Sequence, residues 1–202
     1  MVKKESNHRK RLSTRLILRV FGYLPLGVRK AFFAVLAAIY YHLFPRHRLI
    51  AIHNLKASFP EKDMAEIIDL AWKAYWNIAV VAAEFFDIPR LTRDNIADRV
   101  EAVGLENCEM ALKKGKGILL FSAHFGNWEL IAAALSLYLR PVAFIYRPLD
   151  NALLDDLVFQ VRAAMGHIPL PKERAIRHIL RVLNKNEIVG ILIDQNVAWE
   201  EG

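Results

Sequence analysis

A histidine and a glutamate, five residues apart, are the side chains of this sequence best suited to acid–base chemistry. His124 and Glu129 lie in the segment SAHFGNWEL (122–130), which follows the apolar run GILLFS (117–122). Imidazole changes charge near neutral pH, and a carboxylate that contacts it sets its tautomer and stabilises its protonated form. Such a pair can take the proton from an alcohol. We therefore expect His124 to act as a general base and Glu129 to orient it.

The spacing alone leaves a second interpretation open. On one regular helix, five residues separate two side chains by about 140°. The pair can meet only if His124 lies in a loop that turns back at Gly126, where glycine tolerates the turn. Asn127 is a good N-cap for a helix that begins at Trp128. In the second interpretation, His124 is a loop histidine that caps backbone groups and Glu129 is a first-turn acid on the helix dipole.

The elements expected around this pair form an α/β fold. Apolar runs at 117–122 and 188–193 are typical of buried parallel strands, and further strands are expected at 99–103 and 142–146. Helices are expected at 47–58, 61–86, 105–114, 128–139, 153–165 and 173–183. Strands that alternate with helices predict an α/β sandwich with a mostly parallel sheet. His124 then lies at the carboxyl end of a strand, where such folds place their sites.

The positive charge of the chain is concentrated at its N-terminus. Residues 1–30 hold nine Lys and Arg and one acid, Glu5, whereas residues 31–202 hold nineteen basic and twenty acidic residues. A basic tail beside an apolar segment favours attraction to anionic lipid headgroups, worth about 1 kcal/mol per charge. A nucleic-acid reader would carry its basic residues over a folded face. We therefore expect an anionic membrane surface as a partner, and no nucleic acid.

The apolar segment from Leu16 to Phe44 is broken by charged residues and by the turn residues Pro25 and Gly27. Its uninterrupted part, 31–44, is shorter than the ~20 residues that span a bilayer. No small-residue cleavage site follows it, so a cleavable signal peptide is not expected.

Three interpretations of the apolar segment stay open. Its helices lie in the lipid interface, or form a tilted span with a cytoplasmic N-terminus, or belong to a buried core. We expect residues 1–45 to form a basic tail with membrane-associating helices and residues 46–202 to form the α/β domain.

Four blocks, in order along the chain, carry a family resemblance. They are HRLIAIHNLKASFPEK (47–62), GKGILLFSAHFGNWEL (115–130), IYRPLDN (145–151) and ILIDQN (191–196). From about Arg46 onwards the chain resembles the lipid A late acyltransferases, the lauroyl and myristoyl transferases of the lysophospholipid acyltransferase superfamily. That family continues beyond the point that corresponds to Gly202, so the chain is expected to lack a C-terminal part.

The resemblance implies direct acyl transfer without a covalent acyl-enzyme. His124, oriented by Glu129, would deprotonate a hydroxyl of a lipid A precursor. The oxygen would attack the thioester of an acyl carrier protein or coenzyme A donor at the cytoplasmic face of the bacterial inner membrane. Arg147 would hold a phosphate of donor or acceptor, because guanidinium matches phosphate bidentately. The residues expected to contact substrate are Arg147, Asn127, Asp194 and Gln195.

Other chemistries fit the sequence less well. Ser122 lacks the strained Gly-x-Ser-x-Gly turn of a serine nucleophile. The single cysteine, Cys108, excludes an internal disulfide and a multi-cysteine zinc site, and neither a metal nor a bound cofactor is expected. His167 and His178 stand alone and are expected to be structural. Two alternatives to lipid A acylation remain: acyl transfer to another glycolipid, such as a phosphatidylinositol mannoside, and a non-catalytic membrane-binding module.

Overall fold

The computed structural model describes the backbone of residues 2–194 and the side chains of residues 13–194. The chain groups into two compact units, an α/β unit (1–18 and 87–202) and a helical unit (19–86). The boundary expected at residue 45 concerns membrane association, which this grouping by packing does not address.

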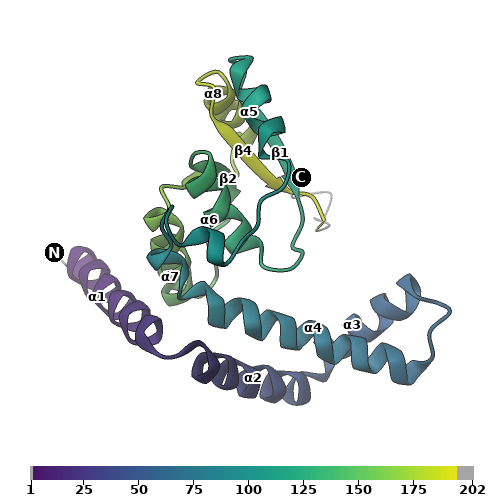
Figure 1. Ribbon diagram of the computed structural model, residues 1–202. Helices are drawn as coiled ribbons and strands as arrows, with labels where there is room; N and C mark the ends of the chain where they lie inside the picture. The colour runs from purple at the N-terminus through teal and green to yellow at the C-terminus, as the bar shows by residue number, and fades with distance from the viewer. Residues whose placement is uncertain (1, 195–202) are drawn as a thin grey trace. The chain divides into compact units, whose positions relative to one another are not determined.

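The helical unit contains the last residues of α1 (Val2–Tyr23) and three further helices (Figure 1). They are α2 (Leu26–Leu43), α3 (Pro45–Ser58) and α4 (Met64–Phe85). Pro25 precedes α2 and separates it from α1 (Val2–Tyr23), as the turn signals predict. The helix α4 begins three residues later than expected, because Asp63 and Glu66 form a capping box in which each side chain accepts from the other's backbone N–H, at 2.8 and 3.1 Å.

One face of α2 packs against α4 through aromatic rings and buried polar contacts. The rings of Tyr41 and Trp72 meet edge to face with centroids 5.3 Å apart. The buried guanidinium of Arg29 donates to the carbonyl oxygen of Ala83 at 2.9 Å. Because these contacts use one face of α2, its opposite face stays exposed.

The α/β unit is built on four parallel strands, in the spatial order β1-β4-β2-β3. The strands are β1 (Ile118–Ser122), β2 (Val142–Tyr146), β3 (Ile168–Pro171) and β4 (Ile188–Leu192). The helices of this unit are α5 (Leu105–Lys113), α6 (Trp128–Tyr138), α7 (Ala152–Ala164) and α8 (Ala175–Leu183), with short 3-10 turns η1 (Ile88–Arg90) and η2 (Ile96–Asp98). The expected α/β class with a mostly parallel sheet is confirmed.

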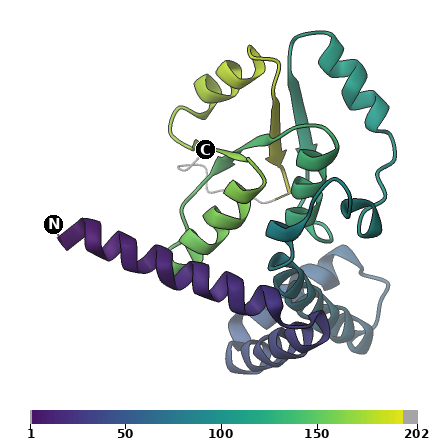
Figure 2. The same ribbon diagram turned by 60° about the vertical axis from the view of Figure 1, so that its left-hand side comes forward.

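Helices cover both faces of the sheet, and Figure 2 shows α8 and α5 on opposite sides of it. On one face the core is formed by Leu112, Val142 and Ile188. On the other face α8 contributes Val182, which packs with Val189 of β4. Burial on both faces explains why β4, which lies inside the sheet, is a continuous apolar run in the sequence. The run of β1 was also expected to be buried, but β1 is an edge strand and leaves Leu119 and Phe121 exposed on one face.

One predicted strand is absent from the structure, and one observed strand was not predicted. The segment 99–103, expected as a strand, has no regular secondary structure, and the carbonyl of Val100 accepts a hydrogen bond from the Tyr138 hydroxyl at 2.7 Å. In contrast, β3 was not predicted, because its sequence IPLP contains two prolines, which cannot donate to a strand ladder. The structure places β3 at an edge of the sheet, where proline is tolerated.

Gly117, directly before β1, tests how closely this sheet is packed. Its φ is +71°, and a Cβ there would lie 2.7 Å from the Glu187 carbonyl oxygen and 2.8 Å from the Leu183 backbone. We expect Gly117→Ala to lower the free energy of unfolding by about 1–3 kcal/mol more than Gly115→Ala. Gly115 is the matched control, because its φ is +72° but no atom lies within 4 Å of its added Cβ. Urea denaturation measures both, and equal losses would contradict the close approach.

Candidate active site

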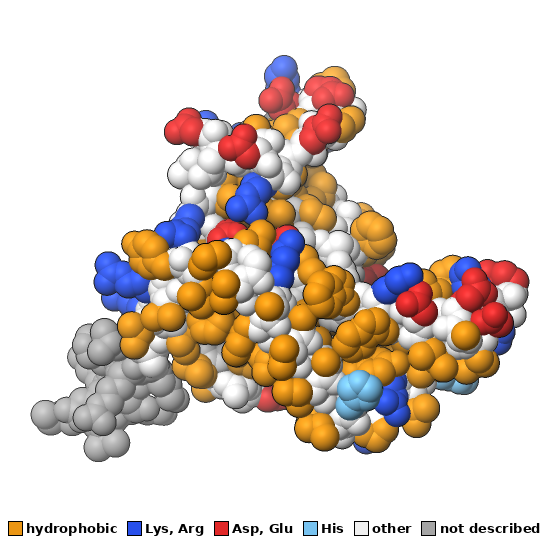
Figure 3. Space-filling model, turned by 60° about the horizontal axis from the view of Figure 1, so that its bottom comes forward, with side chains coloured by type: hydrophobic (Ala, Val, Ile, Leu, Met, Phe, Trp, Pro, Cys, Tyr) orange, Lys and Arg blue, Asp and Glu red, His pale blue; other side chains and the backbone are white. Residues whose placement is uncertain are grey.

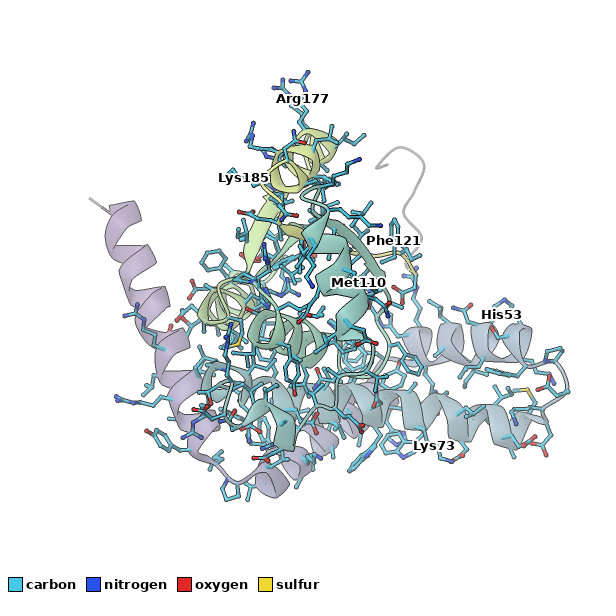
Figure 4. The ribbon with its side chains drawn as sticks, turned by 45° about the horizontal axis from the view of Figure 1, so that its top comes forward. His53, Lys73, Met110, Phe121, Arg177 and Lys185 are labelled. Carbon is cyan, nitrogen blue, oxygen red and sulfur yellow. The ribbon has the colours of Figure 1, made fainter. Side chains whose placement is uncertain are left out.

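The parallel pairing of β1 with β4 places His124 and Asp194 opposite each other. In this register Ser122 lies beside Leu192, and the ladder continues as the N–H of Ile193 donates to the carbonyl of Ser122 at 3.1 Å. His124 and Asp194 each follow two residues beyond the paired ends. Phe121, labelled in Figure 4, marks the carboxyl end of β1 at this edge.

Two hydrogen bonds join His124 to Asp194. The backbone N–H of His124 donates to Asp194 Oδ2 at 2.9 Å, and His124 Nδ1 lies 3.0 Å from Asp194 Oδ1. The hydrogen bond from the His124 side chain holds the pKa of the Asp194 carboxyl below its ordinary value, against the opposing effect of desolvation. An ionised carboxylate only accepts hydrogen bonds, so Nδ1 must carry the proton. The Nε2 of the neutral ring then keeps its lone pair, as a general base requires.

The loop between β1 and α6 has the turn that the sequence predicts. Gly126 adopts a φ of +59°, in the left-handed region that glycine enters without strain. Asn127 is the N-cap of α6, and its Oδ1 accepts from the N–H of Leu130 at 3.0 Å. The expected contact of Asn127 with substrate stays a prediction.

Glu129 binds a residue that the sequence analysis did not identify. Its two carboxylate oxygens accept from Arg162 of α7, at 3.0 Å from Nε and 2.5 Å from Nη2. The side chains are 11% and 24% exposed, and the guanidinium lies 4.6 Å from the ring centroid of Phe144. Bidentate Arg–carboxylate pairs are among the stronger polar contacts in proteins.

The structure therefore brings Asp194, and not Glu129, into hydrogen-bond contact with His124, while Glu129 joins α6 to α7. That Glu129 orients His124 stays a prediction. No sequence motif marks Arg162, which lies 33 residues after Glu129 within an amphipathic helix.

The other expected site residues fall at the same edge of the sheet or outside the described chain. Arg147 follows β2 directly and is exposed. The registers Phe144–Gly190 and Ser122–Leu192 place the ends of β1, β4 and β2 in one row, so Arg147 lies at the edge that carries His124. Gln195 lies outside the described residues.

His167 has the structural position that the sequence analysis expected. It is buried, and its Nδ1 accepts from the backbone N–H of Val142 at 3.3 Å. Burial lowers the pKa of His167. Among the residues that the structure describes, His, Cys, Asp and Glu form no group of three or more that could hold a metal ion.

Comparisons with known proteins agree with the blocks that carry the site. A model of the family described as "Bacterial lipid A biosynthesis acyltransferase" matches residues 4–202. The chain is 27% identical to the Lipid A biosynthesis acyltransferase of Haemophilus influenzae over 192 residues, which cover 91% of this chain and 58% of that protein.

A second relative is the Lipid A biosynthesis lauroyltransferase of Escherichia coli. The chain is 27% identical to it over 154 residues, which cover 76% of this chain and 50% of that protein. The chain thus matches about half the length of these curated relatives.

The contact between His124 and Asp194 predicts how the carboxyl group titrates. We expect the Asp194 pKa to lie below that of an ordinary aspartate and to rise in His124→Ala, which removes the largest lowering effect. The stability that this contact adds is then present above the ordinary aspartate pKa and is lost as the pH falls through the lowered one. Carbon-13 NMR of the carboxyl group measures the pKa, with His178→Ala as control. No rise in His124→Ala would contradict the contact.

Proposed function

The chain belongs to the bacterial lipid A biosynthesis acyltransferase family, and we propose that it moves a fatty acyl group from a thioester to a hydroxyl of a lipid A precursor. The observation that carries this proposal is the hydrogen bond between His124 Nδ1 and Asp194, at the carboxyl edge of a parallel sheet. It leaves Nε2 as the basic atom. The names of the two relatives support the acceptor.

In the proposed reaction, His124 Nε2 takes the proton of the acceptor hydroxyl while its oxygen attacks the thioester carbonyl carbon. The tetrahedral intermediate collapses, the C–S bond breaks, and the proton on Nε2 passes to the leaving sulfur. Asp194 stabilises the imidazolium between these two steps, because its carboxylate accepts a hydrogen bond from Nδ1–H throughout. Backbone N–H groups in the first turn of α6 are suited to stabilise the oxyanion.

Glu129 is proposed to orient His124 through the loop between them. Its ion pair with Arg162 fixes the first turn of α6 against α7, and the turn at Gly126 connects that helix directly to His124. A displacement of about 1 Å in a catalytic group can cost about a hundredfold in rate. Glu129 therefore needs no direct bond to the imidazole in order to matter for catalysis.

The donor is proposed to be an acyl thioester of an acyl carrier protein or of coenzyme A, with no bound cofactor. Both donors carry a phosphopantetheine group. Arg147, exposed at the edge of the sheet, supplies a guanidinium for such a phosphate or for a phosphate of the acceptor. Asn127 and Gln195 are proposed to complete the substrate site.

A membrane surface is the proposed location, at the cytoplasmic face of the bacterial inner membrane. The 18-residue helix α2 is long and apolar enough to be a candidate span, and only 11% of that segment is buried. Its exposed face carries Val28, Phe32, Val35, Leu36, Ile39 and Leu43. Figure 3 shows hydrophobic side chains exposed on the surface of the helical unit.

The packing of α2 favours a helix that lies in the lipid interface over one that spans the membrane. Lys30 of α2 forms an ion pair with Glu84 of α4 at 3.3 Å, and α4 also carries an ion pair between Asp69 and Lys73. A span by α2 would draw these charges towards the hydrocarbon, which is costly. An interfacial helix keeps the charges in water while its apolar face contacts lipid.

The reaction is tested by mass spectrometry of lipids from cells that lack their own late acyltransferase. We expect this gene to add one acyl mass to lipid A, and we expect His124→Ala to reduce the gain about 10²–10⁴-fold, as for loss of a general base. His178→Ala is the histidine control, since His178 lies on α8. A His124-dependent gain of acyl mass on another glycolipid would show that this glycolipid, and not lipid A, is the acceptor. Membrane binding without any lipid change would favour the non-catalytic alternative.

The membrane surface is tested by co-sedimentation with vesicles that contain anionic phospholipid. We expect the double variant Val35→Asp/Ile39→Asp to bind at least tenfold more weakly, because it places two charges on the apolar face of α2. Val103→Asp/Met110→Asp makes the same change at exposed apolar positions of the α/β unit. Equal binding by the two double variants would contradict the proposed surface.

A further inference from the structure

Asp155, at the start of α7, holds the segment that carries Arg147. One oxygen of Asp155, Oδ1, accepts a hydrogen bond from the Tyr146 hydroxyl and another from the backbone N–H of Leu149, at 2.7 Å. The two donors stand on either side of Arg147 in the chain. A single carboxylate oxygen thus ties both ends of the segment 146–149 to one point of α7.

The position of Asp155 is itself fixed by the cap of α7. Asn151 Oδ1 accepts from the N–H groups of Leu153 and Leu154 at 3.0 and 3.1 Å, and the N–H of Asp155 donates to the Asn151 carbonyl at 2.9 Å. An acid in the first turn is also favoured by the helix dipole. Asp155 is therefore a rigid point to which the loop after β2 is attached.

The hydroxyl of Tyr146 stays a donor in this contact. Burial and the hydrogen bond to Asp155 raise the pKa of Tyr146 to about 12. The hydroxyl is therefore protonated over the whole physiological pH range, and the contact to Asp155 does not depend on pH there.

The sheet places this fixed segment near the proposed base. The registers align Phe144, Gly190 and Leu120 across β2, β4 and β1, two residues before the last residue of each strand. Paired strands lie about 4.8 Å apart, so in this row β2 is about 10 Å from β1. Arg147 lies three residues beyond Phe144 and His124 four residues beyond Leu120, so both follow their strands at the same edge of the sheet, where one substrate can contact both.

The next residue in the chain, Asp156, makes different contacts from those of Asp155. Asp156 faces a different way and accepts from Thr14 of α1 at 2.5 Å and from Gln160 at 2.6 Å. The two consecutive acids therefore hold different parts of the α/β unit. Asp156 fastens α1 to α7, and Asp155 fastens the loop that carries Arg147.

We propose that Asp155 is a positioning residue that presents Arg147 to a phosphate of the substrate. This inference rests on the proposed function for the identity of the ligand. A loop that is ordered before binding loses less conformational entropy when the ligand arrives, so affinity rises without a further contact. The effect of Asp155 on ligand affinity must then pass through Arg147.

A double-mutant cycle tests this dependence. Dissociation constants are measured by calorimetry for two phosphate-bearing probes, coenzyme A and a diphosphorylated lipid A precursor in detergent, and the probe that responds to Arg147→Ala identifies the source of the phosphate. We expect Asp155→Ala to weaken binding of that probe about five- to tenfold and to have no further effect in the Arg147→Ala background. Asp155→Asn should restore most of the affinity, because its amide oxygen can accept both hydrogen bonds.

Two controls separate positioning from a general loss of structure. Asp156→Ala removes a neighbouring acid whose contacts lie elsewhere, and we expect it to lower stability without changing the affinity for either probe. Tyr146→Phe removes one of the two hydrogen bonds and should have an intermediate effect on affinity.

An equal loss of affinity on Asp155→Ala with and without Arg147 would overturn the inference. The inference would also be overturned if Arg147→Ala left the binding of both probes unchanged. Because these are binding measurements, they stand apart from acyl transfer. A chain that binds as expected but transfers no acyl group would contradict the proposed function and leave the positioning role intact.

Discussion

The parallel register between β1 and β4 is the constraint on which the proposed active site depends. Two residues 70 positions apart, His124 and Asp194, meet because each follows its strand by two residues and the strand ends are level. A slip of one residue would turn one of these side chains to the other face of the sheet. The register is supported by the apolar side chains of β4, with Ile188 buried on one face of the sheet and Val189 on the other, so the proposed base depends on the core beneath it.

Three further contacts hold the loops at this edge, and each uses a different chemistry. Asn127 caps α6 with a neutral hydrogen bond, whereas Glu129 joins α6 to α7 through a bidentate ion pair. One oxygen of Asp155 accepts hydrogen bonds from both ends of the segment 146–149, at the end of β2. Removing one partner of a partly buried charged pair leaves the other without compensation, which is costly. These contacts therefore hold the helices and loops that border this edge of the sheet.

The strands with a clear apolar pattern were predicted from the sequence, and the strand without one was missed. The runs 117–122 and 188–193 were predicted because strands buried on both faces are continuously apolar. The strand β3 was missed because IPLP resembles a turn, and the run 99–103 resembles a strand although Val103 is 90% exposed. The position of His124 after a strand was also readable, and so was the glycine turn that follows it.

The partners of these residues could not be read from the sequence, because they depend on strand order and helix packing. Consecutive strands most often lie side by side, which would place β2 next to β1, but β4 occupies that position. The block 191–196 therefore placed Asp194 among the expected substrate contacts, but nothing in the sequence indicated its hydrogen bond with His124. Arg162 lies in the middle of α7 and gave none.

The tautomer of His124 is the most direct test of the central claim, that the sheet prepares this histidine as a base. Nitrogen-15 NMR of the imidazole, above the pH at which the ring becomes neutral, distinguishes a proton on Nδ1 from one on Nε2. The hydrogen bond to Asp194 predicts a proton on Nδ1 and an unprotonated Nε2, and it predicts that Asp194→Asn removes this preference. A neutral ring protonated mainly on Nε2, or a tautomer unaffected by Asp194→Asn, would contradict the claim.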